Sequence, residues 1–399
     1  MITKVFTNKD DLAPAAAIVK KGGFCAVPTE TVYGLCVNGL DADAVAALYE
    51  LKGRPEIKPL SLMVPGADDM ELYAKDIPPQ AYTLASKYWP GPLTIVLKAR
   101  ESIPAITLAG GATVGLRCPD HPMTLTLLRQ AGIPLAGPSA NPSGKPSPKT
   151  AAEVLGYFDG RIDALLDGGK CGIGKESTIL DLTATPYRIL RQGALAEDAI
   201  DDALISGMKV IGLTGGSGSG KTTAMNYLVE RGALGIDCDE VYHGLLRECE
   251  PMLAEIKARF PAAFPDGSFE RKALGRIVFA DSAALAELNA ITHRYVYDAV
   301  LRLLRRHARA GGTLAAVDAV ELIGGRLDRL CTLTVGVVAD RKVRAQRIMA
   351  REGISEEYAL SRIDAQKSDE YYEQHCDHVI RNDGDRDALK ARCRELFGI

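Results

Sequence analysis

A glycine-rich segment near the middle of the chain has the residue types and spacing of a phosphate-binding loop. Residues 215–222 read Gly-Gly-Ser-Gly-Ser-Gly-Lys-Thr and satisfy the pattern G-x-x-x-x-G-K-[ST]. Glycines let backbone N–H groups turn toward phosphate oxygens, Lys221 can reach the β- and γ-phosphates, and Thr222 can ligate magnesium. A predicted strand at 210–214 and a predicted helix at 223–231 supply the context that the motif requires. The segment therefore predicts a nucleoside triphosphate site, and a glycine-rich turn without function is the less favoured alternative.

Two acidic residues end the next apolar stretch. Residues 233–239 read Ala-Leu-Gly-Ile-Asp-Cys-Asp, so Asp237 and Asp239 share one face if the strand continues to its last residue. At the carboxyl end of a parallel strand beside the phosphate-binding loop, a carboxylate can accept the proton of an attacking hydroxyl. The alternative is a helix N-cap for a segment that starts at Glu240. The spacing alone leaves both open.

The first half of the chain has no such loop, but small polar and basic residues gather there in islands between apolar stretches. Lys52 and Arg54 follow a predicted amphipathic helix and can hold polyphosphate, while Arg117 ends an apolar strand where it can meet a carboxylate or a phosphate. Ser139 and Asn141 lie in a proline-bracketed turn that supplies short, rigid donors. Turn chemistry explains any single island, whereas all of them together predict a formed pocket.

The composition is that of an ordinary globular protein. The 399 residues are 47% apolar and 25% charged, which excludes disordered, collagen-like and repetitive classes. The net charge of −3 provides no global attraction to nucleic acid or to an anionic membrane, so any contact with RNA or nucleotides must be local. The N-terminus lacks the apolar core of a signal peptide, and no stretch approaches the roughly 18 apolar residues of a membrane span. Nine scattered cysteines without C-x-x-C spacing complete the prediction of a reduced, cytoplasmic protein with no membrane partner.

The chain is predicted to divide near residue 205. An Ala/Asp-rich stretch at 194–207 separates the end of one patterned region from a segment, 208–214, that looks like a fresh N-terminal strand. We therefore expect one domain at 1–200, a linker at 194–207 and a second domain at 208–399. The alternative is a linker inside one large domain.

Five ordered blocks give residues 208–399 a resemblance to the dephospho-coenzyme A kinase family. They are I-G-L-T-G-G-S-G-S-G-K-T, I-D-C-D, the segments 264–281 and 288–293, and H-V-I-R-N-D-G at 378–384. The resemblance implies an α/β P-loop kinase domain, with a parallel sheet flanked by helices and a helical lid. It also implies transfer of the γ-phosphoryl group of ATP, with magnesium, to the ribose 3′-hydroxyl of dephospho-coenzyme A.

The same resemblance assigns roles to individual residues. Asp239 and Lys221 would be catalytic, with Asp239 as the base and Asp237 in support, and Thr222 would ligate the magnesium that accompanies ATP. The dephospho-coenzyme A contacts would be Asp239, Arg271 and His293. The ATP contacts would be Gly216, Ser217, Gly218, Ser219, Gly220, Lys221, Thr222, Arg347 and Arg351.

One segment departs from that family. The family usually carries a Pro-Leu-Leu-hydrophobic-Glu motif after the strand represented here by 314–318, and this chain has Ala-Val-Glu-Leu-Ile-Gly at 319–324. Either Glu321 substitutes after a local shift, or the acceptor pocket is weakened; the sequence does not decide. The alternative function for this half is a different P-loop small-molecule kinase.

Five further motifs give residues 1–193 a resemblance to the threonylcarbamoyl-AMP synthase family. They are P-T-E-T-V-Y-G-L, K-x-R-P, W-P-G-P-L-T, P-S-A-N-x-S-G and E-S-T-I. The resemblance implies a YrdC-like domain, a twisted α/β open sheet. It implies condensation of L-threonine, bicarbonate and ATP to threonylcarbamoyl-AMP and pyrophosphate, the donor for threonylcarbamoyladenosine in tRNA.

The site residues implied by this second resemblance are basic and hydroxyl side chains. The ATP contacts would be Lys52, Arg54, Ser61, Thr113, Ser139, Asn141, Ser147 and Arg191. The threonine contacts would be Thr29, Arg117 and Thr178.

Two departures from the synthase family are visible. Met63 stands where some relatives carry a threonine-contacting histidine, and the additional C-terminal domain of longer members is absent. The expected partners are the small-molecule substrates, together with tRNA or tRNA-modification proteins through the N-terminal domain. The competing reading of this half is a module that only binds RNA.

Overall fold

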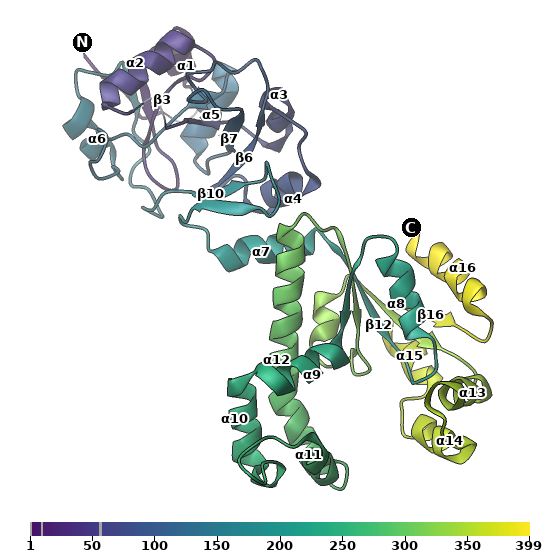
Figure 1. Cartoon of the computed structure of the whole chain (residues 1–399). Helices are drawn as coiled ribbons and strands as arrows, with labels where there is room; N and C mark the ends of the chain where they lie inside the picture. Colours follow the sequence, from purple (N-terminus) through teal and green to yellow (C-terminus); the bar gives the residue numbers. More distant parts are fainter. Residues whose placement is uncertain (1, 9–10, 56–57) are drawn as a thin grey trace. The chain divides into compact units, whose positions relative to one another are not determined.

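The computed structural model describes residues 2–8, 11–55 and 58–399. The chain separates into two compact units, which are described one at a time: unit 1 comprises residues 1–207 with 309–311, and unit 2 comprises residues 208–308 with 312–399 (Figure 1).

Unit 1 is built on one mixed sheet. Its strands run in the order β1-β9-β2-β3-β8-β4-β7-β6-β10-β11, with β5 paired to β6. The strand bounds are β1 Lys4–Phe6, β2 Cys25–Val27, β3 Gly34–Asn38, β4 Ser61–Met63, β5 Ala74–Lys75, β6 Leu93–Ala99, β7 Thr113–Arg117, β8 Leu135–Ala136, β9 Ala164–Leu166, β10 Thr178–Asp181 and β11 Arg188–Arg191. The helices are α1 Ala13–Lys20, α2 Ala42–Lys52, α3 Met70–Tyr73, α4 Pro79–Tyr88, α5 Pro122–Ala131, α6 Ala151–Phe158 and α7 Glu197–Ser206.

Local sequence signals set the ends of helix α2, which places two predicted site residues. The Asp41 side chain accepts from the N–H groups of Asp43 and Ala44 at the N-terminus, and Gly53 ends the helix with φ 59°. Lys52 is therefore the last helical residue, and Arg54 begins the chain that leaves the helix.

Unit 2 has a parallel sheet in the order β13-β14-β12-β15-β16. The strands are β12 Lys209–Thr214, β13 Leu234–Asp237, β14 Leu314–Asp318, β15 Leu333–Val338 and β16 His378–Arg381. Helices α8 Lys221–Val229 and α16 Arg386–Phe397 pack together, and Tyr227 and Phe397 belong to the same buried core as strand residues Ile211 and Val335. Because all the strands are parallel, their carboxyl ends form one edge, where the phosphate-binding loop also begins.

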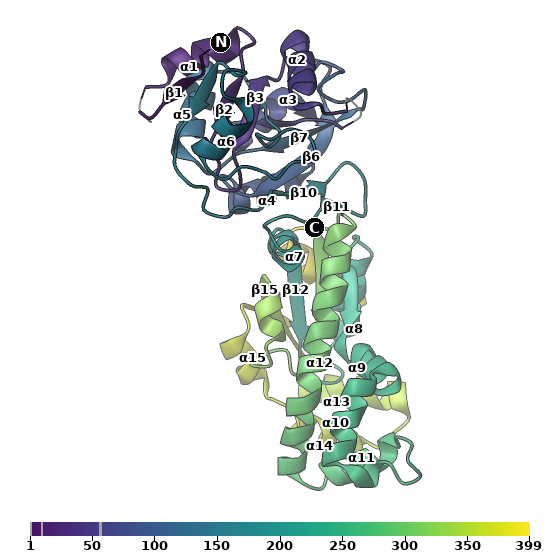
Figure 2. The ribbon, with the colours of Figure 1, turned by 90° about the vertical axis from the view of Figure 1, so that its left-hand side faces the viewer.

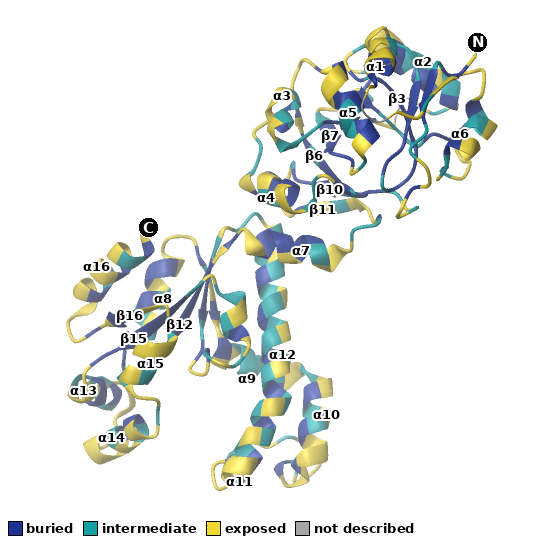
Figure 3. Cartoon of the chain, turned by 180° about the vertical axis from the view of Figure 1, so that it is seen from behind, coloured by how far each residue is buried: buried dark blue, intermediate teal, exposed yellow. Residues whose placement is uncertain are grey.

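The other helices of unit 2 form two smaller packed groups. Helices α9 Cys238–Glu248, α10 Glu250–Arg259, α11 Arg271–Val278 and α12 Ser282–Arg309 share a buried apolar cluster. In Figures 1 and 2, α12 runs alongside α9 and α10. Helices α13 Arg341–Glu352 and α14 Glu356–Asp364 have a small core of their own, and α15 Asp369–His375 precedes β16. In Figure 3 the sheet strands of both units are largely buried. The predicted mixed α/β class, with a parallel sheet and helices in unit 2, is confirmed.

Three sequence-predicted segments differ in the structure. The strand expected at 233–239 ends at Asp237, because Asp237 caps helix α9. The helix expected at 223–231 starts earlier, at Lys221. The stretch 194–207, expected as a linker, contains α7, whose residues Ile200, Ala203 and Leu204 are buried.

No helix among the described residues is both long enough and apolar enough to span a bilayer.

Candidate active sites

In unit 2 the predicted phosphate-binding loop connects β12 to α8. Gly215, Gly218 and Gly220 have φ values of 143°, 77° and 108°, a region that L side chains rarely adopt. A Cβ added to Gly215 would lie 2.1 Å from the carbonyl oxygen of Val337, so the loop also needs glycine there for space. The loop ends at the first residue of α8, where the free N–H groups of a helix N-terminus favour anions.

Side chains from distant segments hold this loop from the outside. Arg344 Nε donates to Ser217 O (3.0 Å), Gln366 Oε1 accepts from Ser217 N (2.9 Å), and Asn382 Nδ2 donates to Ser219 O (2.7 Å). Arg344 Nη2 also donates to Gln366 Oε1 (2.7 Å). We call Arg344, Gln366 and Asn382 the loop brace. Sequence reasoning missed it, although Gln366 and Asn382 lie in segments that look typical of the kinase family.

The two arginines expected to contact ATP lie on lid helix α13. Arg347 Nη1 donates to the carbonyls of Gly218 (3.3 Å) and Asn382 (3.0 Å), so its guanidinium lies against the loop. Arg351, one turn further on, pairs with Glu352 at 2.5 Å. The structure brings Arg347 to the phosphate-binding loop and leaves Arg351 on an ion pair within the lid.

Lys221 and a half-buried carboxylate lie together at the carboxyl edge of the sheet. Lys221 Nζ donates to Gly215 O (2.9 Å). Asp318 ends β14 and is opposite Leu213 of β12 and Asp237 of β13. Burial raises the pKa of Asp318 to about 6; the charge of Lys221 opposes this shift, and the charges of Asp237 and Asp239 add to it. Sequence reasoning missed Asp318, for which the signal was an acidic residue at the end of the apolar run at 314–317.

The two acids after β13 have different roles. The Asp237 side chain accepts from the N–H groups of Asp239 (2.8 Å) and Glu240 (3.2 Å), so it is the N-cap of α9. The expectation that Asp237 and Asp239 share a strand face was wrong, because Asp239 is already in the first turn of the helix. The capping alternative is confirmed for Asp237. Asp239, in the first turn of α9, lines the adjacent cavity.

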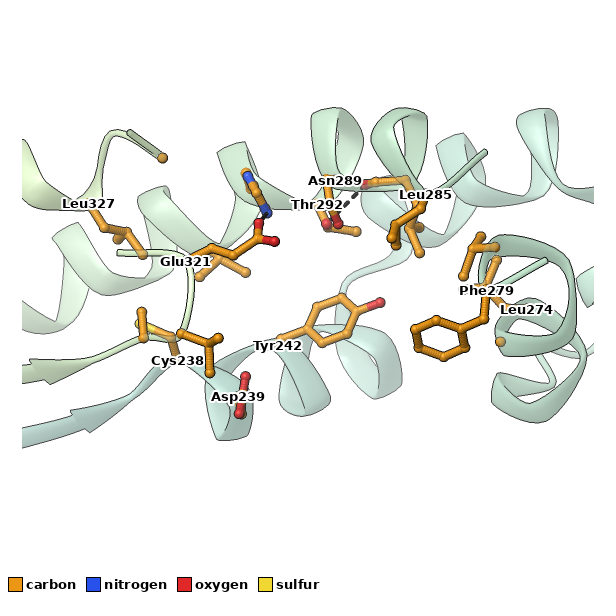
Figure 4. Close-up of a pocket in the computed structure, with 18 of the residues that line it drawn as sticks. Cys238, Asp239, Tyr242, Leu274, Phe279, Leu285, Asn289, Thr292, Glu321 and Leu327 are labelled. Carbon is orange, nitrogen blue, oxygen red and sulfur yellow. Dashed lines mark hydrogen bonds and ion pairs between the residues drawn. The ribbon is translucent and has the colours of Figure 1, made fainter. Parts of the chain in front are cut away.

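This cavity, of about 320 Å³, brings together the three residues expected to bind the phosphoryl acceptor. Asp239 on α9, Arg271 on α11 and His293 on α12 all line it. Figure 4 shows Asp239 and Tyr242 on one side, Glu321 and Thr292 on the other, and Phe279 toward one end. Much of the remaining wall is apolar and includes Leu274, Val278, Leu285, Leu288, Val296, Val320 and Leu327.

In the atypical segment 319–324, Glu321 lines the same cavity. Its Oε2 lies 3.4 Å from Nε2 of His293, while its neighbour Leu322 is fully buried. Of the two alternatives that the sequence left open, the position of Glu321 favours a local substitution.

In unit 1 a smaller pocket of about 150 Å³ brings together six of the predicted residues. They come from strands β4, β7 and β11 and from the loops beside them: Thr29, Arg54, Ser61, Arg117, Ser139 and Arg191. Met63 also lines the pocket, where the sequence placed it. Hydroxyl groups and guanidinium groups are combined in this wall, a set of donors suited to phosphate and carboxylate oxygens.

The remaining predicted residues of unit 1 do not line this pocket. Lys52 is buried and donates to the carbonyls of Ser139 and Asn141, and burial, with the charge of Arg54, lowers its pKa to about 7. Thr178 Oγ1 donates to Leu195 O (2.7 Å), and Ser147 Oγ donates to Glu176 (2.7 Å).

The last two of these residues also lie outside the pocket lining. Thr113 pairs with Lys98 across β6 and β7, and Asn141 Nδ2 donates to Lys145 O (2.6 Å).

Two arginine side chains that line this pocket are held by residues that sequence reasoning missed. Arg117 Nη2 donates to Glu30 (2.6 Å) and to Thr31 Oγ1 (2.8 Å). Arg191 Nη2 donates to the carbonyl oxygen of Ser177 (2.8 Å). Glu30 and Thr31 belong to the P-T-E-T-V-Y-G-L block and Ser177 to E-S-T-I, so the motifs contained the signal.

Comparisons with known proteins match the two units separately. Residues 17–193 match the Sua5–YciO–YrdC family, described as "Telomere recombination", and residues 209–387 match the family described as "Dephospho-CoA kinase". A threonylcarbamoyl-AMP synthase of Pyrococcus abyssi is 44% identical over 190 residues, which are 48% of this chain and 56% of the relative. The one from Bacillus subtilis is 43% identical over 197 residues, 49% of this chain and 57% of the relative. This chain therefore spans just over half the length of these synthases.

The second unit matches its relatives over nearly their whole length. A dephospho-CoA kinase of Thermobifida fusca is 35% identical over 192 residues, which are 48% of this chain and 95% of the relative.

Proposed function

Because the chain belongs to the dephospho-CoA kinase family through its second unit and carries a Sua5–YciO–YrdC domain in its first, we propose that it is a bifunctional enzyme. One domain, 1–200, would form L-threonylcarbamoyl-AMP and pyrophosphate from L-threonine, bicarbonate and ATP. The other, 208–399, would phosphorylate the 3′-hydroxyl of dephospho-CoA with ATP. The observation that carries the proposal is that each unit has its own pocket, lined by the residues that its own motifs assign.

In the proposed kinase the sheet edge positions both substrates. Lys221 and the N-terminus of α8 would neutralise the phosphates of ATP. Thr222 is exposed, and its hydroxyl would offer the hard oxygen that Mg²⁺ of MgATP prefers. Asp239 would accept the proton of the attacking hydroxyl from its side of the cavity. Arg271 and His293 would bind the charged acceptor. Catalysis would then be mostly positioning together with charge stabilisation.

In the proposed synthase no side-chain nucleophile is required. The amine of threonine would attack the carbon of bicarbonate and give a carbamate with loss of one water molecule. A carbamate oxygen would then attack the α-phosphorus of ATP, and the bond from that phosphorus to the bridging oxygen of pyrophosphate would break as pyrophosphate leaves. Arg54 and Arg191 line the pocket and would stabilise the charge on the leaving group. Arg117 and Thr29 would hold threonine, and Lys52 would act from behind by fixing the loop that carries Ser139. We further propose a cytoplasmic location and tRNA, or the proteins that modify it, as partners of this domain.

The synthase proposal is tested by threonine-dependent release of pyrophosphate from the full chain. We expect Arg191→Ala to lower kcat/KM for ATP by about 10- to 100-fold, as for the loss of one charge-assisted contact. Arg188→Ala is the matched control, because Arg188 begins the same strand and its side chain is 68% exposed. A wild-type chain that binds RNA but releases no threonine-dependent pyrophosphate would favour the RNA-binding alternative.

The kinase is expected to lose activity in acid because of Asp318. Its raised pKa of about 6 means that the carboxylate is charged at pH 7.5 and mostly protonated at pH 5. Protonation removes the negative charge of Asp318 at the sheet edge. That charge would otherwise attract the ammonium group of Lys221 and the magnesium of bound MgATP. We expect kcat/KM to fall about tenfold per pH unit well below pH 6. Asp318→Asn should be slow at every pH and should not show this fall; if it keeps the wild-type profile, another group is responsible.

A further inference from the structure

The acceptor cavity of unit 2 contains a carboxylate that the proposed mechanism does not use. Glu321 reaches the cavity from the loop after β14, while Asp239, the proposed base, comes from α9 on the other side (Figure 4). Its carboxylate lies 3.4 Å from Nε2 of His293 on α12. Two acids therefore line one cavity, and only Glu321 is paired with a predicted acceptor contact.

The fold of the loop explains why a carboxylate enters the cavity at this position. The Ala319 N–H donates to Leu213 O (3.1 Å), and Leu322 is fully buried, so the loop is fixed on both sides of Glu321. Asp328 Oδ2 accepts from Gly324 N (3.0 Å) and holds the end of the turn.

At the position where the family motif has its glutamate, this chain has a glycine whose backbone conformation disfavours a glutamate side chain. When Leu322 is aligned with the second leucine of Pro-Leu-Leu-hydrophobic-Glu, the motif glutamate falls at Gly324 and the first leucine at Glu321. Gly324 has φ 75°, a conformation that suits glycine and strains other residues. In this chain the acid has thus moved three residues and faces the cavity in place of an apolar side chain.

A carboxylate beside one ring nitrogen of a histidine fixes which nitrogen carries the proton and how the ring is turned. The Glu321 and His293 side chains are 66% and 40% exposed, so without this partner the His293 ring would be freer to leave the cavity. Asp239 and Arg271 come from other elements, α9 and α11.

We propose that Glu321 is a positioning residue for the acceptor: it holds His293 in the orientation that contacts dephospho-CoA, and thereby sets acceptor affinity in this chain. This inference rests on the proposed kinase function. It predicts an effect on the acceptor and no effect on ATP, because the Glu321–His293 pair lies in the acceptor cavity.

The test measures steady-state kinetics of the full chain with Glu321→Leu, the apolar residue type of the motif, and with Glu321→Gln. We expect Glu321→Leu to raise KM for dephospho-CoA about tenfold with kcat and KM for ATP within about twofold, and Glu321→Gln to restore part of the loss. In a His293→Gln background the Glu321→Leu change should have little further effect. Glu248→Gln, on α9 and outside the cavity lining, is the control.

Four outcomes of these measurements would count against the proposal or against the kinase function on which it rests. An unchanged KM for dephospho-CoA in Glu321→Leu overturns the proposal, as does an effect that simply adds to that of His293→Gln. A fall in the thermal unfolding midpoint that accounts for the loss would indicate a structural role and also overturns it. If the wild-type chain phosphorylates no dephospho-CoA, the kinase function itself fails, and that result is distinct from the other three.

Discussion

Replacing Lys221 with alanine is expected to lower kcat/KM for dephospho-CoA phosphorylation by about 10³-fold or more, the scale seen when a transition-state cation is removed from a phosphoryl-transfer site. Lys221 begins α8 at the end of the glycine-rich loop, and its ammonium group bridges back to the carbonyl of Gly215. In the loaded enzyme the same group would neutralise charge on the β- and γ-phosphates. The measurement is coupled-assay turnover of the full chain.

The same variant tests the independence of the two sites. Threonine-dependent pyrophosphate release should stay within about twofold of wild type, because unit 1 has its own pocket and its own cations. Lys390→Ala is the matched control, since Lys390 is a partly exposed lysine of the same unit that pairs with Glu230. Near-normal kinase turnover in Lys221→Ala would contradict the phosphate-binding role.

Asp239→Asn is the second large effect that we expect, a loss of about 10²- to 10⁴-fold in kcat, the usual contribution of a general base. Asparagine keeps the size of the side chain but cannot take the proton of the attacking hydroxyl. KM for ATP should change little, because Asp239 lines the acceptor cavity rather than the glycine-rich loop.

The variant Asp237→Asn tests whether a loss of activity comes from the proposed base, Asp239, or from disturbing the N-terminus of α9. Asp237 caps α9, and asparagine caps helices about as well as aspartate, so this variant should keep its activity. If Asp237→Asn loses as much activity as Asp239→Asn, the assignment of the base to Asp239 fails.

Much of the fold and of both sites could be predicted, because the informative residues are close in sequence. The glycine-rich loop, the strand before it and the helix after it form one continuous segment, and the structure keeps them in that order. Helix α2 was also predictable, since Asp41 and Gly53 mark its ends by local hydrogen bonding and by backbone conformation.

The loop brace could not be predicted, because its members are far apart along the chain. Arg344 donates to Ser217 from 127 residues away and Asn382 to Ser219 from 163 residues away. In the sequence, Arg344 is one of several basic residues at helical spacing, a pattern that usually marks a solvated face. Only the packing of the lid helix against the loop shows that this residue is buried.

The sequence also could not predict which side chains of the unit 1 motifs point into the pocket. Lys52 and Thr178 are in the right motifs, but both bind backbone groups instead of lining the pocket. Buried carbonyl and N–H groups need partners, and a nearby ammonium or hydroxyl group is often recruited to supply them. A motif specifies which residues are near a site. It leaves open whether their side chains contact the ligand or instead bind the backbone of the loop that contacts the ligand.

The brace has a thermodynamic consequence for the lid of unit 2. Helices α13 and α14 are held together by their own small core, Ala345, Ile348, Ala359 and Ile363, so they can respond as one body. Arg344 and Arg347 join that body directly to the carbonyls of the glycine-rich loop. The conformation of the loop and the position of the lid are therefore coupled equilibria, and thermodynamic linkage makes this coupling reciprocal. If nucleotide binding favours the ordered lid by a given free energy, ordering of the lid strengthens nucleotide binding by the same free energy.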